Sequence, residues 1–242
     1  MRNFIVATML MVSVVACHTE QNQLKEVDLG SALSVAQIGG RIDPELADQW
    51  IINFQSSYND ETKGALFGRE ALLDLLDQSG SQGIWFTRAL DEQGVQKLVL
   101  FSADADGDFL NVKRPDGRIE SGMPMDQGQM CPPTCPNGGG RLEGIDVAKI
   151  GGVITQEVSD LWIASYQSTY TNRSRGFLFG KDIILDLLSN QEAQGLWIIN
   201  GLTDQSIEKL VLYPADESGN ILENVGPVDQ GQLCPPNCPV SL

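Results

Sequence analysis

Four cysteines occur as two closely spaced pairs, and these pairs are the residues best suited to covalent chemistry. Cys131/Cys135 and Cys234/Cys238 each lie in a Cys-Pro-Pro-x-Cys-Pro sequence. Such pairs in an exported protein are usually disulfides. Four cysteines allow three pairings, and we favour Cys131–Cys135 and Cys234–Cys238 because each segment carries a complete pair. A zinc site is the alternative, because three intervening residues also suit zinc ligands.

A run of acidic residues supplies further candidate metal ligands: Asp104, Asp106, Asp108 and, later in the chain, Asp216. A calcium-binding EF-hand loop needs glycine at position six and glutamate at position twelve. Counted from Asp104, those positions hold Phe109 and Pro115. The run therefore departs from that motif. Gly107 within it is typical of a hairpin turn, so we predict a turn here.

Several kinds of chemistry are excluded by composition. His18 is the only histidine, which removes histidine triads and His-rich metal sites. The motifs of serine hydrolases, P-loop proteins, dinucleotide-binding proteins and zinc proteases are absent. The 32 acidic and 16 basic residues give a net charge of −16, whereas nucleic-acid binding needs a basic surface. We therefore predict no nucleic-acid partner, no cofactor and no enzymatic activity.

Most of the chain is a repeat. Residues 33–110 align with residues 145–222 at a constant offset of 112, and 34 of the 78 positions are identical. The cysteine segments align at an offset of 103, so the first copy carries nine extra residues between Leu110 and Asp126. Each copy is long enough to be a small domain. The sequence therefore indicates a tandem duplication.

The elements that must position these residues follow the same order in each copy. Asp43 and Thr155 are candidate N-caps of amphipathic helices, whose aromatic residues recur every four positions. A second helix is expected at residues 69–78 and 181–190. Strands are expected at residues 84–90 and 97–101. We predict an α+β fold of two tandem homologous units, each a helix, a helix and a β-hairpin with an additional short strand, related by a pseudo-twofold axis.

Two sets of side chains recur in both copies and allow other interpretations. The tryptophans are Trp50, Trp85, Trp162 and Trp197, and the carboxylates are Asp48/Asp160 and Asp74/Asp186. Tryptophans can stack on sugars, but their spacing favours core packing. The carboxylates allow a glycosidase-like pair, although their helical positions suit solvated residues.

The N-terminus has the features of an export signal. Arg2 precedes an apolar stretch of about 12 residues, which is too short to span a membrane. It ends in Val14-Val15-Ala16-Cys17, which resembles a bacterial lipobox. The resemblance implies cleavage before Cys17 and lipidation of Cys17, and several acyl chains anchor a protein stably. Loss of residues 1–16 removes one basic residue and no acid, so the net charge becomes one unit more negative.

The repeated unit also resembles a group of known proteins. Its features are Phe-Gly before a helix, Gln-Gly-Ile/Leu-Trp, and Leu-Val-Leu followed by Ala-Asp, with a terminal Cys-Pro-Pro-x-Cys-Pro. In order and spacing it is similar to small uncharacterised proteins of Bacteroidota. This resemblance covers residues 33–239 as two copies, and it implies no activity.

The expected organisation is a signal peptide (1–16), a lipidated tether (17–32), repeat domain 1 (33–136), a linker (137–144) and repeat domain 2 (145–242). We expect a non-catalytic binding or scaffolding protein, anchored to the membrane by the lipid on Cys17, in the cell envelope and at the outer membrane. Its partner would be another envelope protein, bound bivalently by the two copies. One alternative is an inhibitor or immunity lipoprotein that neutralises a basic secreted enzyme. The other is a carboxylate-based envelope hydrolase, which requires a cleft with two acids of raised pKa.

Overall fold

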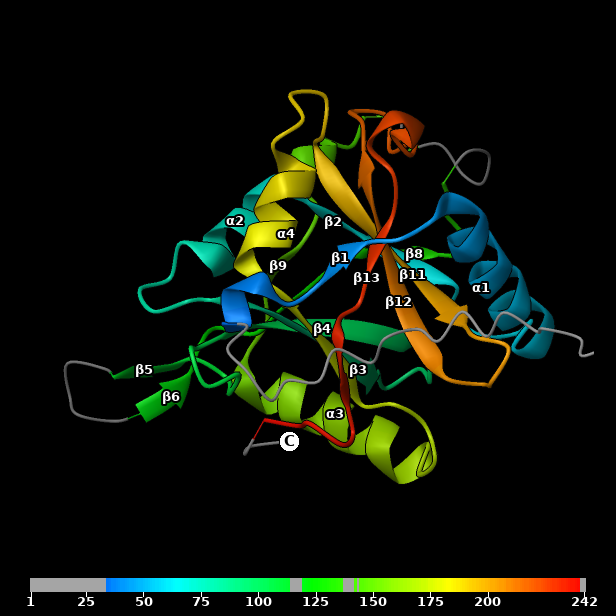
Figure 1. Cartoon of the computed structure of the whole chain (residues 1–242). Coiled ribbons are helices and arrows are strands. Elements are labelled where there is room, and N and C mark those ends of the chain that lie inside the picture. The colour runs from blue at the N-terminus through cyan, green and yellow to red at the C-terminus, as the bar shows by residue number, and fades with distance from the viewer. Residues whose placement is uncertain (1–33, 114–118, 137–141, 143, 240–242) are drawn as a thin grey trace, which may run out of the picture. The chain divides into compact units, whose positions relative to one another are not determined.

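The computed structural model describes residues 34–113, 119–136, 142 and 144–239. The α-helices in these residues are α1 (Pro44–Ser57), α2 (Arg69–Leu76), α3 (Gln156–Thr169) and α4 (Lys181–Leu188). Three short 3-10 helices are η1 (Val35–Gln37), η2 (Val147–Lys149) and η3 (Glu223–Val225). The fold is α+β, as predicted (Figure 1).

The strands form two antiparallel sheets of six strands and one hairpin. Sheet 1 has the order β1 (Gly40–Arg41), β13 (Val228–Asp229), β12 (Glu208–Ala215), β11 (Gly195–Leu202), β2 (Gly64–Gly68) and β8 (Gln129–Cys131). Sheet 2 has the order β14 (Gln232–Cys234), β10 (Gly176–Gly180), β3 (Gly83–Leu90), β4 (Gln96–Ala103), β7 (Met125–Asp126) and β9 (Gly152–Val153). The separate hairpin pairs β5 (Asn111–Lys113) with β6 (Ile119–Ser121).

Each six-stranded sheet contains three strands from each half of the chain. In sheet 1, β2 of the first half pairs with β11 of the second, and Gly68 lies opposite Gly195. In sheet 2, β10 of the second half pairs with β3 of the first, and Gly180 lies opposite Gly83. Gly68 corresponds to Gly180 and Gly83 to Gly195 at the offset of 112, so both sheets have the same strand register, with the roles of the two halves exchanged. The halves are interleaved, and the boundary expected near residues 137–144 does not separate one sheet from the other.

Apolar side chains fill three layers of this arrangement. Inward-facing residues of both sheets, including Phe86, Phe179 and Ile198, form a central core with α2 and α4. A second core lies between α1 and the outer face of sheet 1, around Trp197. The third lies between α3 and the outer face of sheet 2. Alternate residues of each central strand therefore serve different cores, as the two-residue period of a strand requires.

The helix starts were predicted correctly, whereas several strands were missed, among them β2 and β10. The Asp43 carboxylate accepts hydrogen bonds from the amides of Glu45 and Leu46, and the Thr155 hydroxyl accepts one from Val158. The second helices end earlier than expected, at Leu76 and Leu188. Strands β2 and β10 were missed because each is a run of only five residues that begins and ends with glycine. Burial on both faces leaves such a run without polar alternation.

The 3-10 helix of each half closes against a strand of the other half. The Gly68 amide donates to the Ile150 carbonyl after η2 at 2.6 Å, and the Gly180 amide donates to the Ile38 carbonyl after η1 at 2.7 Å. Gly68 has an ordinary extended backbone with φ of −73°. It must be glycine because a Cβ atom there would clash with the carbonyl oxygens of Val147 and Ala148.

This close approach predicts a large effect of Gly68→Ala. The new methyl group would meet backbone atoms, which cannot rotate away, so the free energy of unfolding should fall by about 3 kcal/mol. Gly94→Ala is the control, because Gly94 has a φ of +76° but open space around it. That change should cost only the backbone strain of about 1 kcal/mol. Urea unfolding measures the free energy of unfolding of both variants. Equal losses in the two variants would contradict the close contact between the halves at Gly68.

Candidate functional site

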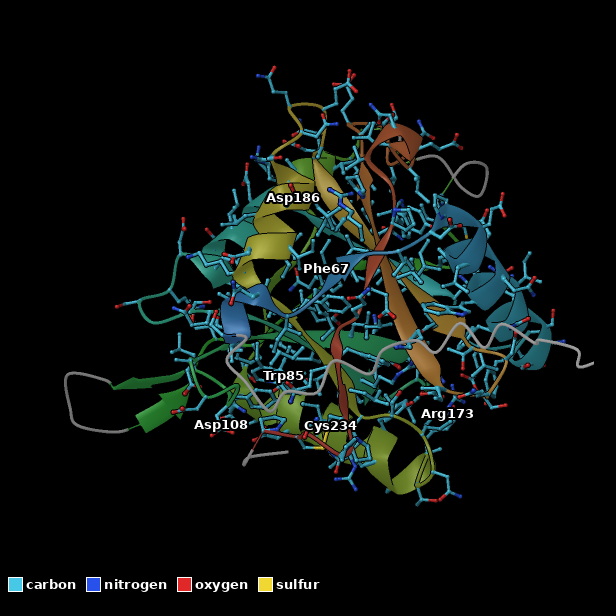
Figure 2. All side chains as sticks on the ribbon, viewed as in Figure 1. Phe67, Trp85, Asp108, Arg173, Asp186 and Cys234 are labelled. Carbon is cyan, nitrogen blue, oxygen red and sulfur yellow. A yellow bond between two sulfur atoms is a disulfide. The ribbon has the colours of Figure 1, made fainter. Side chains whose placement is uncertain are left out.

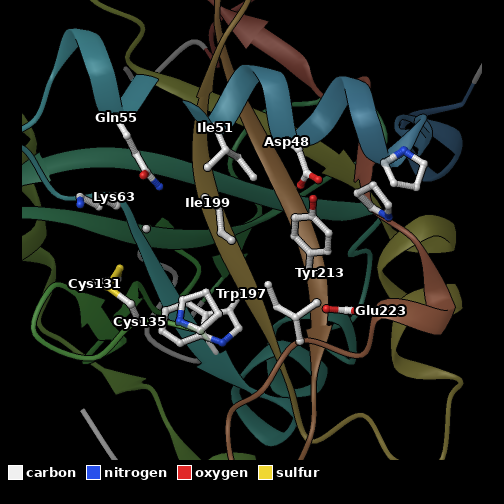
Figure 3. Close-up of a pocket in the computed structure, with 15 residues that line it drawn as sticks. Asp48, Ile51, Gln55, Lys63, Cys131, Cys135, Trp197, Ile199, Tyr213 and Glu223 are labelled. Atoms are coloured by element: carbon white, nitrogen blue, oxygen red, sulfur yellow. A yellow bond between two sulfur atoms is a disulfide. The ribbon is translucent and has the colours of Figure 1, made fainter. Parts of the chain in front are cut away.

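A groove with a volume of about 660 Å³ lies between α1 and the outer face of sheet 1. We call it the α1 groove. Figure 3 shows Ile51 of α1 above it, with Ile199 and Trp197 of β11 in its floor. Its volume lies within the range of about 300–1,000 Å³ that is usual for small-molecule sites. The remaining lining residues are Pro44, Asp48, Gln55, Lys63, Gly64, Cys131, Cys135, Pro136, Tyr213, Ile221, Glu223 and Pro227.

Polar side chains lie at the two ends of the α1 groove (Figure 3). Lys63 and Gln55 are at one end, whereas Asp48, Tyr213 and Glu223 are at the other. Burial, and to a smaller degree the carboxylate of Asp48, raises the pKa of the Tyr213 hydroxyl above its ordinary value. That hydroxyl therefore stays protonated at neutral pH and can donate a hydrogen bond.

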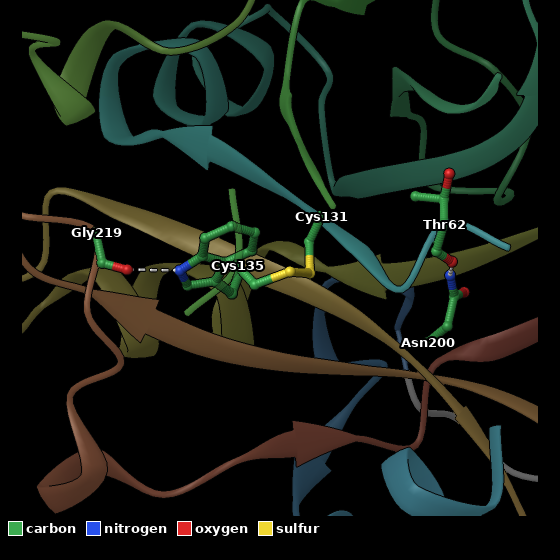
Figure 4. The surroundings of a disulfide bond; sticks show 6 residues. Thr62, Cys131, Cys135, Asn200 and Gly219 are labelled. Atoms are coloured by element: carbon green, nitrogen blue, oxygen red, sulfur yellow. Dashed lines mark hydrogen bonds between the residues drawn. A yellow bond between two sulfur atoms is a disulfide. The ribbon is translucent and has the colours of Figure 1, made fainter. Parts of the chain in front are cut away.

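The Cys131–Cys135 disulfide forms part of the groove wall. The two Cα atoms are 4.7 Å apart, and the second bond, Cys234–Cys238, has the same separation. This is the pairing that the sequence favoured over the two alternatives. The disulfide packs with Trp197, whose indole N–H donates to the Gly219 carbonyl at 2.8 Å (Figure 4). The wall and the floor are thus held together independently of α1.

On the other face, an aromatic side chain packs in the core between α3 and sheet 2. Phe109 is 5% exposed and stacks on Phe101 with ring centroids 4.2 Å apart. At the repeat offset of 112, these positions correspond to Ile221 and Tyr213 in the α1 groove. Ile221 is smaller and offers no ring to stack on Tyr213. This difference between the halves is one of those that distinguish the α1 groove from the surface under α3.

A cluster of buried charges joins the halves at one end of the central core. Arg88 and Glu208 are 3% and 7% exposed, and their side chains are 3.6 Å apart. Arg88 also donates a hydrogen bond to the side-chain amide oxygen Oδ1 of Asn200 at 2.9 Å. Arg173, which is labelled in Figure 2, pairs with Glu208 and, at 2.9 Å, with Glu61. Two positive and two negative side chains thus balance one another in a site with little water.

Several partners in this charge cluster occupy equivalent positions in the two halves. Glu61 corresponds to Arg173, and Arg88 corresponds to Asn200, each at the offset of 112. Side chains at positions that correspond in the sequence thus touch each other in this cluster. Arg173 also lies 4.0 Å from the ring centre of Tyr58 and 5.9 Å from that of Tyr170, another equivalent pair. Identical halves would place like charges against each other here.

A buried aspartate–lysine pair occurs in each half. Asp229 is fully buried, and its Oδ2 lies 3.2 Å from Lys209 Nζ. Asp126 is 1% exposed and lies 4.0 Å from Lys97. Burial raises the pKa of both carboxyls above the ordinary value and outweighs the opposing effects of the lysines and of neighbouring backbone amides. Neither aspartate lines the α1 groove.

The candidate metal ligands in the acidic run take part in turns. The Asp104 carboxylate accepts hydrogen bonds from the amides of Asp106 and Asp108 at 2.9 and 3.0 Å. Asp216 accepts from the amides of Ser218 and Asn220, both at 2.8 Å. These contacts match the predicted turn. Within the described residues, no three His, Cys, Asp or Glu side chains converge as a metal site would require.

The tryptophans and shared carboxylates are dispersed. Trp85 and Trp197 are buried, and their indole N–H groups bond to Gly107 and Gly219. Asp48 lines the α1 groove, whereas exposed Asp186 pairs with Arg41. The raised pKa values belong to Asp126 and Asp229, outside the groove.

The expected lipidation site, Cys17, the signal peptide and the tether lie outside the described residues. No helix in the described part of the chain is long and apolar enough to cross a membrane. Comparison with known protein families, curated proteins and solved structures gave no match to this chain.

The charge cluster predicts a specific non-additivity. Arg173→Met should lower the free energy of unfolding by about 3 kcal/mol, because it leaves an uncompensated negative charge in a buried cluster. Adding Glu208→Gln restores neutrality, and glutamine is the residue at the equivalent position, Gln96. The double variant should be more stable than Arg173→Met alone in urea unfolding. If the two losses simply add, the side chains are not coupled as described.

The buried aspartates predict a pH dependence with a definite sign. A raised pKa in the folded state means that the protonated carboxyl favours folding. This contribution is complete below the unfolded value of about 4 and is lost as pH rises through the folded pKa. The stability of the natural protein relative to Asp229→Asn should therefore fall as pH rises above 4. Asp126→Asn should show the same trend in urea titrations. A relative stability that rises with pH would reverse the assigned direction.

Proposed function

We propose that this protein is a lipid-anchored, non-catalytic binding module of the cell envelope, and that its ligand site is the α1 groove. The observation that supports this most strongly is the groove itself. It combines an apolar floor with a few polar groups at defined places, as ligand sites generally do. The anchor at Cys17 is part of the proposal and rests on the lipobox-like sequence alone.

The rigidity of the surroundings supports a preformed site. The groove floor belongs to β11 and β12, which are central in sheet 1, and one wall carries the disulfide. A site on such elements loses little conformational entropy when a ligand binds. Since Asp48, Gln55 and Ile51 come from consecutive turns of α1, one helix supplies the opposite wall.

We further propose that the two halves arose by tandem duplication and are related by a pseudo-twofold axis. The matching helices, strands and registers support this. After duplication, the inner faces kept their apolar character while the outer faces diverged, so that binding is assigned to one face only. The protein would then bind one ligand in the α1 groove, rather than one in each half.

The internal repeat suggests how to close the groove. Ile221→Phe should place a ring against Tyr213, as Phe109 lies against Phe101, and so narrow the groove without disturbing the sheet. The natural protein is incubated with small molecules extracted from bacterial envelopes, and retained compounds are identified by mass spectrometry after ultrafiltration. We expect Ile221→Phe to lose this retention almost completely.

Phe109→Ile is the matched control because it changes the same position on the other face. It should leave retention unchanged, and circular dichroism should show that both variants are folded. If Ile221→Phe retains the same compounds as the natural protein, the α1 groove is not the binding site. If the natural protein retains nothing, the binding function itself is wrong.

A further inference from the structure

We propose that the α1 groove binds a short peptide, with a cationic group at the Asp48 end and a carboxylate at the Lys63 end. This inference rests on the proposed binding function and adds the chemical class of the ligand. It is carried by the distribution of charge along the groove, with opposite signs at opposite ends of an apolar floor (Figure 3).

The acidic end is suited to an ammonium or guanidinium group. Asp48 projects from α1 and Glu223 from η3, and the Tyr213 ring lies at the same end (Figure 3). Neither carboxylate forms an ion pair with another described side chain. Two carboxylates and an aromatic ring are groups that bind organic cations, through charge-assisted hydrogen bonds and through the ring face.

The basic end is suited to a carboxylate. The backbone of Lys63 is fixed, because its amide donates to the Cys131 carbonyl at 2.7 Å and its carbonyl accepts from the Asn200 amide at 2.8 Å. Its ammonium has no ion-pair partner among the described residues. Gln55 lies at the same end and offers an amide for a second hydrogen bond (Figure 3).

The middle of the groove favours apolar side chains over sugar hydroxyls. Ile51 and Ile199 face this part from opposite sides, and the indole of Trp197 already donates to Gly219. A peptide with an apolar middle residue satisfies both the ends and the floor. A free sugar would leave its hydroxyls against isoleucine without partners, which is unfavourable.

The other outer face does not reproduce this pattern. Asp160 and Arg175 correspond to Asp48 and Lys63, but the stacked rings of Phe101 and Phe109 pack between α3 and sheet 2. Asp160→Asn is therefore a matched control for Asp48→Asn, because both remove an exposed carboxylate from the same helical position.

The experiment uses the full chain and a pooled tetrapeptide library with free termini. After ultrafiltration, we expect enrichment of peptides with a basic first residue and an apolar middle, and loss of this enrichment in Ile221→Phe. The best peptide is then titrated by calorimetry. Asp48→Asn and Glu223→Gln should each weaken its binding about ten-fold, whereas Asp160→Asn should not.

The contribution of the Lys63 end of the groove is tested separately, by changing the C-terminus of the peptide. Lys63→Gln should weaken binding of the peptide with a free C-terminal carboxylate about ten-fold. It should leave the binding of the same peptide with an amidated C-terminus unchanged. If no peptide is retained, or if Asp48→Asn and Lys63→Gln bind as the natural protein does, the ligand class is wrong. Retention of envelope compounds that Ile221→Phe abolishes would then still support a binding function, with a different ligand. If the natural protein retains neither envelope compounds nor peptides, both proposals are overturned.

Discussion

The burial of four charges at one end of the central core constrains the rest of the structure. Arg88 and Glu61 come from the first half, and Arg173 and Glu208 come from the second. Isolated charges in such a place would be strongly destabilising, so each needs a partner of opposite sign. Most of these ion pairs join a residue of one half to a residue of the other. The charges are therefore compatible with the core only when the strands of the two halves are interleaved.

The interleaved strands in turn determine where the protein can diverge. The central core uses equivalent residues from both halves, so a change in one half affects packing against the other. The outer faces are less constrained, because each is covered by its own helix. Phe109 stacks on Phe101 on one face, whereas Ile221 lines the α1 groove on the other. Differences between side chains at corresponding positions thus distinguish the two outer faces.

Local patterns in the sequence were enough to predict individual elements. Asp43 and Thr155 marked the helix starts, and each cysteine pair lay within one copy. The exchange of strands was not predictable in this way, because a repeated sequence has the same apolar pattern whether strands pair within a copy or between copies. The short runs of β2 and β10 were missed for lack of alternation.

The functional groups were harder to predict than the fold. Asp48 was identified as a shared carboxylate, but its place in a groove depends on how α1 packs on sheet 1, which no local motif shows. The charge cluster did leave a signal in the sequence. Glu61 aligns with Arg173, and Arg88 aligns with Asn200. Contact between two aligned positions requires such a reversal or loss of charge, but the pairing of the strands had to be known first.

The interleaving of the halves also has a consequence for the order of synthesis. Strand β3 lies beside β10, and β10 lies beside β14 at residues 232–234. The N-terminal half alone can form a hairpin from β3 and β4, but it cannot complete either sheet. A growing chain would therefore keep apolar strand edges unpaired until its last segment emerged. Such dependence on distant pairing makes folding slow and exposes the unfinished chain to aggregation.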